Sequence, residues 1–157
     1  MGHERPEVRS ALLGALHQVA ERGNKAAVAA AAGLLEDREP AVRAEAFRAV
    51  VALAERGDVR AIAAVVSRMG DASPSLRLDA SRLLSKVADR GDRNAVAGLA
   101  SLLQSRLPDV RKLALEALPR MAERGDEDAV GPAVGLLQDE KVGVRHEAFI
   151  AVAALAE

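Results

Sequence analysis

The chain has 157 residues, with 22 Lys and Arg against 23 Asp and Glu, two Phe, and no Trp, Tyr or Cys. Balanced charge argues against binding to nucleic acid or anionic membranes by charge neutralisation, and no Trp or Tyr ring is present on which bases could stack. The lack of Cys excludes disulfides and thiolate metal sites, and no apolar run reaches the roughly 18 residues of a membrane span. We therefore expect an intracellular, cytoplasmic protein.

One phrase recurs along the chain at a fixed interval. Val-Arg or Leu-Arg begins at positions 8, 42, 76, 110 and 144, a spacing of 34 each time, and Pro stands two residues earlier in the first four copies. A second phrase, Glu or Asp followed by Arg-Gly and then by Asn or Asp, begins at positions 21, 55, 89 and 123. A regular period of this length indicates a repeat protein, in which each copy is one supersecondary unit.

Each period is expected to hold one longer and one shorter amphipathic helix. The longer helix begins at the Pro, which suits a first helical position because its missing N–H would be unpaired there. The first longer helix is predicted from Pro6 to Arg22 and the second from Pro40 to Arg56, and later copies begin at positions 74, 108 and 142. The shorter helices are predicted over residues 25–36, 59–70, 93–104 and 127–138.

The predicted helix from Pro40 to Arg56 carries its apolar residues on one face. They follow the period of an α-helix, and they are Val42, Ala46, Ala49, Val50 and Leu53. Gly57 then comes at the C′ position, where a left-handed backbone is tolerated without a Cβ clash. Asp58 can accept the free N–H groups of the next helix, so a turn of two residues is predicted between the helices.

The apolar faces of these helix pairs determine the predicted fold. One pair cannot bury its apolar face alone, so pairs must stack on their neighbours. We therefore predict an all-α fold, a right-handed α-solenoid of stacked antiparallel helix pairs with a 34-residue period. Residues 1–157 are expected to form a single domain.

The repeated phrase resembles the HEAT repeat, particularly the short HEAT-like type of phycobilisome-lyase-related proteins. The matching residues are Leu34-Leu35-Glu36-Asp37, followed by Pro40-Ala41-Val42-Arg43, and the resemblance covers nearly the whole chain. It implies a ladder of hydrogen bonds between repeats, made by the turn Asp and the helix Arg. The residues at the matching places are Asp37, Asp71 and Asp139 with Arg43, Arg77 and Arg145, while Ser105 interrupts the Asp column.

The resemblance also implies where each unit begins. In the family the shorter helix comes first, so we expect a lone second helix (6–23) and then four helix pairs (24–57, 58–91, 92–125 and 126–157). Neither end shows a polar capping helix, which favours a segment of a longer repeat array. The lone helix would leave Leu12, Leu16 and Val19 unpartnered, and this face predicts end-to-end self-association.

Two enzymatic alternatives come with the resemblance. In HEAT-like deoxyhypusine hydroxylases, His-Glu pairs of several repeats bind two irons, and His146-Glu147 stands at the matching place. The other repeats carry Ser10-Ala11, Ala44-Glu45, Leu78-Asp79 and Lys112-Leu113 there. A bilin lyase-like activity is the second alternative, but the chain shows no distinctive chromophore-binding stretch. We therefore expect no catalytic residue, no metal site and no cofactor.

A partner surface is expected where the repeats differ, on the outward face of the longer helices, which line the concave side in the family. The predicted contact residues are Arg48, Val51, Leu78, Arg82, Lys86, Lys112, Glu116, Arg120, His146 and Ile150. A mixture of charged and apolar residues suits a protein or peptide better than a polyanion. The sequence therefore predicts an interaction scaffold for a protein or peptide, which binds neither nucleic acid nor membranes and is not an enzyme.

Overall fold

The computed structural model describes residues 5–35 and 37–156, with only the backbone of His17, and over this range the chain is an all-α solenoid. No strand occurs in the described residues, so the predicted all-α repeat architecture is confirmed. The helices are α1 (Pro6–Val19), α2 (Lys25–Ala32), α3 (Pro40–Leu53), α4 (Val59–Met69), α5 (Pro74–Val87), α6 (Arg93–Leu102), α7 (Pro108–Met121), α8 (Glu127–Gly135), the 3-10 turn η1 (Leu136–Gln138) and α9 (Val142–Leu155).

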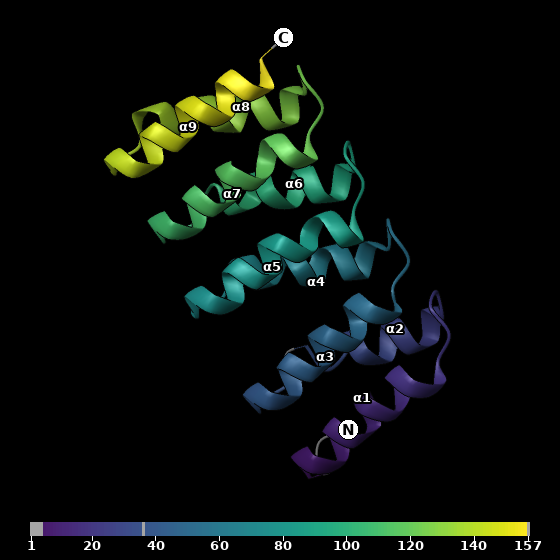
Figure 1. Ribbon diagram of the computed structural model, residues 1–157. Coiled ribbons are helices and arrows are strands. Elements are labelled where there is room, and N and C mark those ends of the chain that lie inside the picture. The colour runs from purple at the N-terminus through teal and green to yellow at the C-terminus, as the bar shows by residue number, and fades with distance from the viewer. Residues whose placement is uncertain (1–4, 36, 157) are drawn as a thin grey trace.

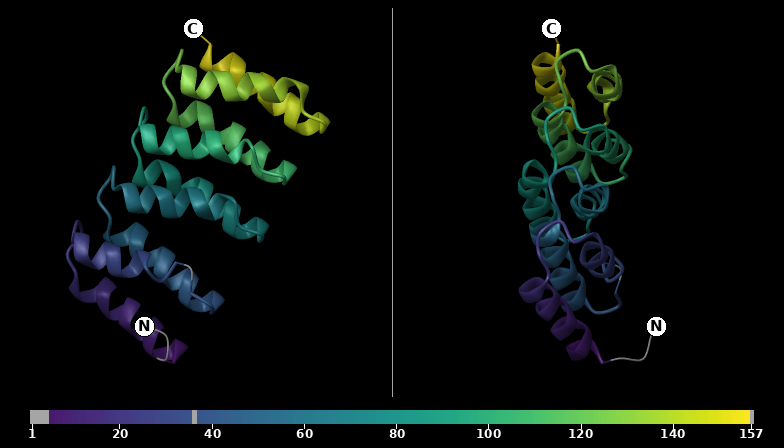
Figure 2. Two further views of the ribbon diagram at one scale, coloured as in Figure 1. Left: turned by 180° about the vertical axis from the view of Figure 1, so that it is seen from behind. Right: turned by 90° about the vertical axis from the view of Figure 1, so that its right-hand side faces the viewer.

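The helices form two layers. In the right-hand view of Figure 2 the longer helices α1, α3, α5, α7 and α9 make one layer, and the shorter helices α2, α4, α6 and α8 make the other. Each shorter helix packs on the longer helix that follows it in the chain. The pairs stack in one direction, so α1 and α9 lie at opposite ends of the molecule (Figure 1).

Small apolar side chains fill the space between the helices. On α3, the five residues of the predicted apolar face are all buried, with relative exposures of 3% or less. Equivalent Ala, Val and Leu residues of the other repeats continue the same core along the stack. Because most of these side chains are small, neighbouring helices approach closely.

The longer helices end three residues earlier than predicted. The helix α3 stops at Leu53, and Ala54 is extended with ψ at 145°, so five residues rather than two connect α3 to α4. A helix continuing to Arg56 would pair the carbonyl of Leu53 with the N–H of Gly57. That carbonyl instead accepts the N–H of Gly23 in the preceding repeat, at 2.7 Å. The hydrogen bond from the turn of the preceding repeat therefore takes the place of the bond that another turn of helix would make.

The same exchange recurs along the array. The N–H of Gly57 bonds the carbonyl of Val87 at 2.8 Å, and that of Gly91 bonds Met121 at 2.6 Å. The predicted left-handed conformation of the turn glycines is confirmed, since their φ values lie between 72° and 86°. The predicted capping of the shorter helices is also confirmed, and the capping side chains are those of Asn24, Asp58, Asp92 and Asp126.

The shorter helices also end before their predicted limits. The helix α2 ends at Ala32 rather than at residue 36, and α6 ends at Leu102. In the last repeat α8 ends at Gly135 and a single 3-10 turn completes the segment. Pro132 lies inside α8 and cannot donate a backbone hydrogen bond, which weakens that helix.

Replacing a turn glycine tests this capping. Gly91→Ala should lower the free energy of unfolding by about 1 kcal/mol, because φ at this residue is +80° and the new Cβ would lie 3.0 Å from Oε1 of Glu123. Gly14→Ala is the matched control: it lies inside α1 with open space around it, so it should be neutral or stabilising. Urea denaturation of both variants measures the difference, and equal stabilities would contradict the assigned turn.

Candidate interaction surface

The arginine of the Arg-Gly turn bonds to the next repeat beside the glycine. Nε of Arg22 donates to the carbonyl of Ala54, and Nε of Arg90 donates to that of Ala122, each at 3.0 Å. Sequence reasoning assigned roles to the Gly and to the capping Asp of this phrase, but none to the Arg. The available signal was the recurrence of Arg in all four copies of the phrase. These arginines cap helix ends.

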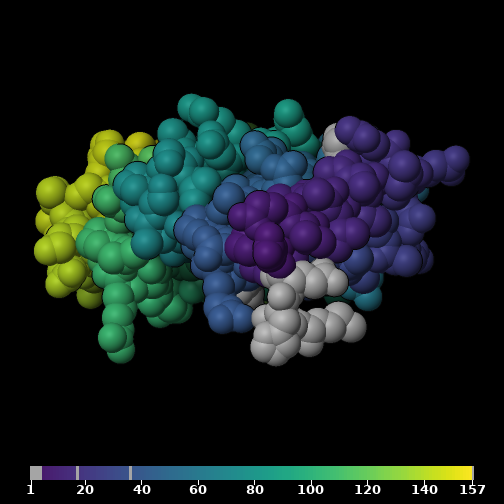
Figure 3. Space-filling model, turned by 90° about the horizontal axis from the view of Figure 1, so that it is seen from below, coloured from purple at the N-terminus to yellow at the C-terminus, as the bar shows by residue number. Residues whose placement is uncertain are grey.

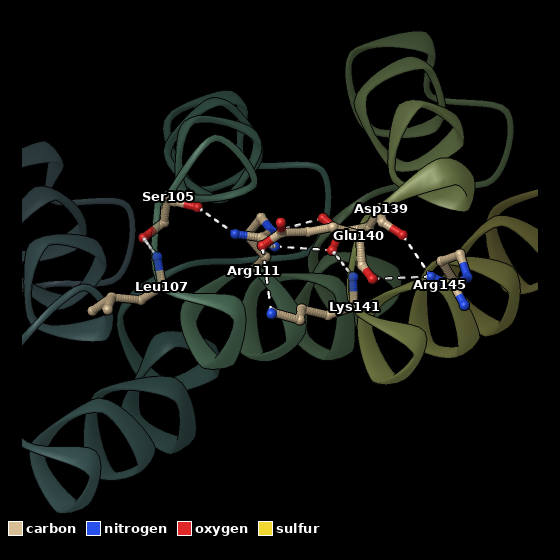
Figure 4. A network of polar contacts seen from close by, with 7 residues as sticks. All are labelled: Ser105, Leu107, Arg111, Asp139, Glu140, Lys141 and Arg145. Atoms are coloured by element: carbon tan, nitrogen blue, oxygen red, sulfur yellow. Dashed lines mark hydrogen bonds and ion pairs between the residues drawn. The ribbon is translucent and has the colours of Figure 1, made fainter.

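The arginine of the Pro-x-Val-Arg phrase joins two repeats, as Figure 4 shows for Arg111. Its Nε and Nη2 donate to the two carboxylate oxygens of Asp139 at 2.8 and 2.9 Å, and its Nη1 donates to the carbonyl of Ser105 at 2.8 Å. Nη1 of Arg145 donates in turn to the carbonyl of Asp139 at 2.8 Å. Arg111 therefore bonds a carbonyl in the turn that precedes its own helix, at Ser105, and a carboxylate in the equivalent turn of the next repeat, at Asp139.

The pairs implied by the resemblance meet at carbonyls rather than at carboxylates. Nη1 of Arg43 donates to the backbone carbonyl of Asp37 at 2.7 Å. The carboxylate of Asp37 is bound instead by Arg9 of the preceding repeat, at 2.7 and 2.8 Å. The sequence predicts ladder or capping roles for Arg9 and Arg111 as for the other arginines of this column, but the expected pairs did not join them to these carboxylates, although each stands 28 residues before the Asp that it binds.

Two places in the ladder depart from this pattern. The carboxylate of Asp71 accepts a hydrogen bond at 3.0 Å from Arg68 of its own repeat. Ser105 offers no carboxylate to Arg77, whose Nη2 lies 3.6 Å from Asp109 on the following helix. Arg77 keeps its bond to the carbonyl of Asp71, at 2.9 Å. The ladder is therefore continuous through carbonyls and interrupted through carboxylates in the middle of the array.

The ladder alters the acidity of two carboxyl groups. The hydrogen bonds from Arg111 hold the pKa of Asp139 below its ordinary value near 3.8, against the opposing effect of burial. Arg9 lowers the pKa of Asp37 in the same way, with help from the N–H of Glu39. A carboxyl group whose pKa is lower in the folded state stabilises the fold above its unfolded pKa, and this contribution is lost as the pH falls through the folded pKa.

The predicted contact residues lie on the outward side of the longer helices, a surface that we call the long-helix face. Val51 is half-buried, and the other nine predicted residues are exposed. They do not form one cluster, but spread over α3, α5, α7 and α9. Arg120 reaches from α7 to the hydroxyl of Ser81 on α5 at 3.2 Å, and Lys112 lies 3.8 Å from Glu116.

A cavity of about 440 Å³ opens on this face between α3 and α5. These two helices touch far less than α1 touches α3 or α7 touches α9, and Figure 1 shows them standing further apart than the other neighbouring longer helices. We call this cavity the α3–α5 slot, and its lining residues are Ala44, Phe47, Arg48, Arg68, Leu76, Asp79, Arg82, Leu83 and Lys86. Of these, sequence reasoning had selected only Arg48, Arg82 and Lys86.

The residues considered for a metal site lie apart from this slot. His146 is exposed and Glu147 half-buried on α9. Among the side chains that the structure describes, no three of His, Asp and Glu are grouped as metal ligands. Within the same part of the chain, no helix has both the length and the apolarity that crossing a membrane requires.

Comparison with known proteins places this architecture. A family model described as HEAT repeats matches residues 1–85. No match was found among curated proteins. Among solved structures, a designed armadillo repeat protein in complex with the peptide (KR)4 is 19% identical, with a TM-score of 0.53 over 95% of this chain and 76% of that one. Computationally designed armadillo repeat proteins for modular peptide recognition are 22% identical, with a TM-score of 0.53 over 96% and 76%.

Asp139→Asn tests the ladder. The amide keeps an acceptor for the N–H of Lys141 but loses the charge that Arg111 binds, so unfolding at neutral pH should become easier by about 1–3 kcal/mol. The difference from wild type should begin to shrink as the pH falls below about 3.8 and should vanish only below the lower pKa that Asp139 has in the folded protein, because the wild-type carboxyl group is protonated there.

Guanidinium denaturation over a pH series measures both effects. Asp71→Asn is the matched control, because its side chain is 25% exposed against 6% for Asp139 and its partner Arg68 lies in the same turn. It should lose less stability. A pH-independent difference for Asp139→Asn would contradict the role assigned to its charge.

Proposed function

The chain belongs to the HEAT-repeat family, and we propose that it is a scaffold that binds a protein or peptide on its long-helix face. The observation that carries this proposal is the composition of that face, where exposed apolar residues such as Leu78 and Ile150 stand among Arg, Lys and Glu side chains. Such a surface is suited to a macromolecular partner rather than to a small substrate. We propose that the long-helix face is the concave side of the array.

The nature of the partner follows from charge. The designed armadillo repeat protein of similar fold binds a basic peptide, (KR)4. Here the predicted contact residues include five cations, Arg48, Arg82, Lys86, Lys112 and Arg120, against the single anion Glu116. Like charges across an interface are unfavourable, so this face disfavours a basic ligand and favours an acidic one.

We further propose that the repeats are of the short HEAT-like type and that the units span residues 6–23, 24–57, 58–91, 92–125 and 126–157. The phrase Leu-Leu-x-Asp followed by Pro-x-Val-Arg supports the subtype. We propose a domain organisation of a lone second helix and four helix pairs, and a location in the cytoplasm. A scaffold role is proposed in place of metal-dependent chemistry because no three His, Asp or Glu side chains of the described residues are grouped as metal ligands. It is proposed in place of bilin lyase-like chemistry because the sequence has no distinctive chromophore-binding stretch.

A second proposal is end-to-end self-association. Figure 3 looks onto the α1 end, where α1 forms the surface nearest the viewer, and Leu12 and Val19 of α1 are 51% and 79% exposed. Leu16 packs partly on the core and is not left unpartnered. At the opposite end Val142 and Phe149 of α9 are 72% and 66% exposed. Two apolar ends favour head-to-tail contact between copies.

Paired substitutions test the scaffold. Peptides selected from a display library on the immobilised chain should bind Leu78→Asp with Arg82→Glu about tenfold more weakly or worse, because both changes fall on the long-helix face. The control is Val59→Asp with Arg60→Glu, the same chemistry at exposed positions of α4 in the other layer. It should leave binding unchanged. Equal binding by all three proteins would reject the proposed face.

Sedimentation tests the association of ends. The average mass of the wild-type chain should rise with concentration, and Phe149→Glu should hold the protein closer to the monomer, because a charge replaces the exposed ring. Val59→Glu, an exposed apolar residue away from the ends, is the control. A wild-type mass that stays at the monomer value at every concentration would contradict this proposal.

A further inference from the structure

We propose that the α3–α5 slot binds an acidic peptide segment by taking up one bulky apolar side chain, while the carboxylates of the segment meet the cations at its rim. This inference rests on the proposed function and names a partner and a place for it. It is carried by departures from the repeat pattern that converge on one junction of the array.

Two large side chains stand where α3 faces α5. Phe47 occupies the position that Leu13, Ser81 and Leu115 hold in α1, α5 and α7, and Phe149 repeats it on α9. Leu83 occupies a position that holds Ala in every other copy, at Ala15, Ala49, Ala117 and Ala151. Both side chains line the slot. Two enlarged side chains across one junction cannot interdigitate at the usual helix spacing, so they hold α3 and α5 apart.

The separation uncovers an apolar residue that is buried elsewhere. Leu76 begins the Leu-Arg phrase of α5 and is 37% exposed. Its counterparts Val42, Val110 and Val144 are at most 2% exposed, because the preceding longer helix covers them. The slot therefore offers the side chains of Phe47, Leu76 and Leu83 to a ligand. Its volume lies within the range of roughly 300–1,000 Å³ that is usual for ligand pockets.

A buried cation stands beside this apolar surface. Arg68 of α4 occupies the position of Leu34, Leu102 and Leu136 in the other repeats. Its side chain is 11% exposed, its guanidinium lies 5.9 Å from the centre of the Phe47 ring, and its Nη1 bonds Asp71. Nη2 is buried and has no hydrogen-bond partner among the described residues. An unpaired buried donor is unfavourable, so an acceptor brought by a ligand would be stabilised here.

Charge selects an acidic ligand. The lining of the slot contains the cations Arg48, Arg68, Arg82 and Lys86 and a single anion, Asp79. The exposed cations stand at the rim, where Arg48 pairs with Glu45 and Arg82 with Asp79 on their own helices and each arginine side chain remains 71% exposed. A segment with one apolar residue between carboxylates matches both the apolar floor and the basic rim. A basic segment would meet like charge.

Three short fluorescent peptides test the ligand by anisotropy. The first has one leucine flanked by glutamates, the second replaces the leucine by serine, and the third replaces the glutamates by lysines. The first should bind about tenfold or more tightly than either of the others, and its affinity should fall as salt is added. Failure of the first peptide to bind wild type, or equal binding of all three, overturns the inference.

Variants that restore the repeat pattern test the place. Phe47→Leu with Leu83→Ala gives the α3–α5 junction the same Leu and Ala pair that α1 and α3, and α7 and α9, have at these positions. Arg68→Leu restores the leucine that the other repeats have at that position. Both should bind the glutamate-flanked peptide about tenfold more weakly. Thermal melts should show that both remain folded. Should either fail to fold, Arg82→Glu with Lys86→Glu changes only exposed rim residues and should give the same loss.

A further pair separates this inference from the proposed function. Leu78→Asp with Lys112→Glu alters the long-helix face outside the slot lining. If it weakens binding while the slot variants do not, the partner binds elsewhere on that face, so the slot is wrong and the scaffold stands. If only Val59→Asp with Arg60→Glu weakens binding, both are wrong. Loss confined to the slot and rim variants supports the inference.

Discussion

Each longer helix after α1 ends on hydrogen bonds that the preceding repeat supplies. The last carbonyl of α3 accepts the N–H of Gly23 and the next one accepts the guanidinium of Arg22. The carbonyls at a helix end must find partners, and here these partners lie in another unit. The turn must therefore present a glycine in the left-handed conformation at the same height in every repeat. This requirement explains why the Arg-Gly phrase recurs without insertion.

A frame as regular as this one makes local departures informative. A Leu in place of Ala at position 83 would be an ordinary core variation in an irregular protein. Here the neighbouring copies show what the junction contains when it is closed, and Phe47, Leu83 and Arg68 all differ from them at the same junction. The α3–α5 slot is thus defined by comparison within one molecule. The other contacts between longer helices show how this junction would pack without these three residues.

Much of the architecture could be predicted from the sequence because its causes are local. The period, the apolar face of α3, the capping Asp58 and the left-handed Gly57 each follow from residues close together in the chain. The ends of the longer helices could not be predicted in this way, because the partner of the Leu53 carbonyl lies in another repeat. The carboxylate partners Arg9 and Arg111 were missed for the same reason. The slot depends on Phe47, Arg68 and Leu83 together, and comparing any one of these positions with its counterparts in the other repeats does not reveal it.

The looseness of the α3–α5 junction has a consequence for the array as a whole. In a linear array the stability of each unit depends on its coupling to its neighbours. Where α3 and α5 touch so little, that coupling falls mainly on the shorter helices of the second layer. The repeats on either side of this junction then form two blocks that are joined mainly through the shorter helices, and we expect the molecule to bend most readily at the open side of the junction. Whatever fills the slot also sets the angle between the blocks, and so the curvature of the superhelix.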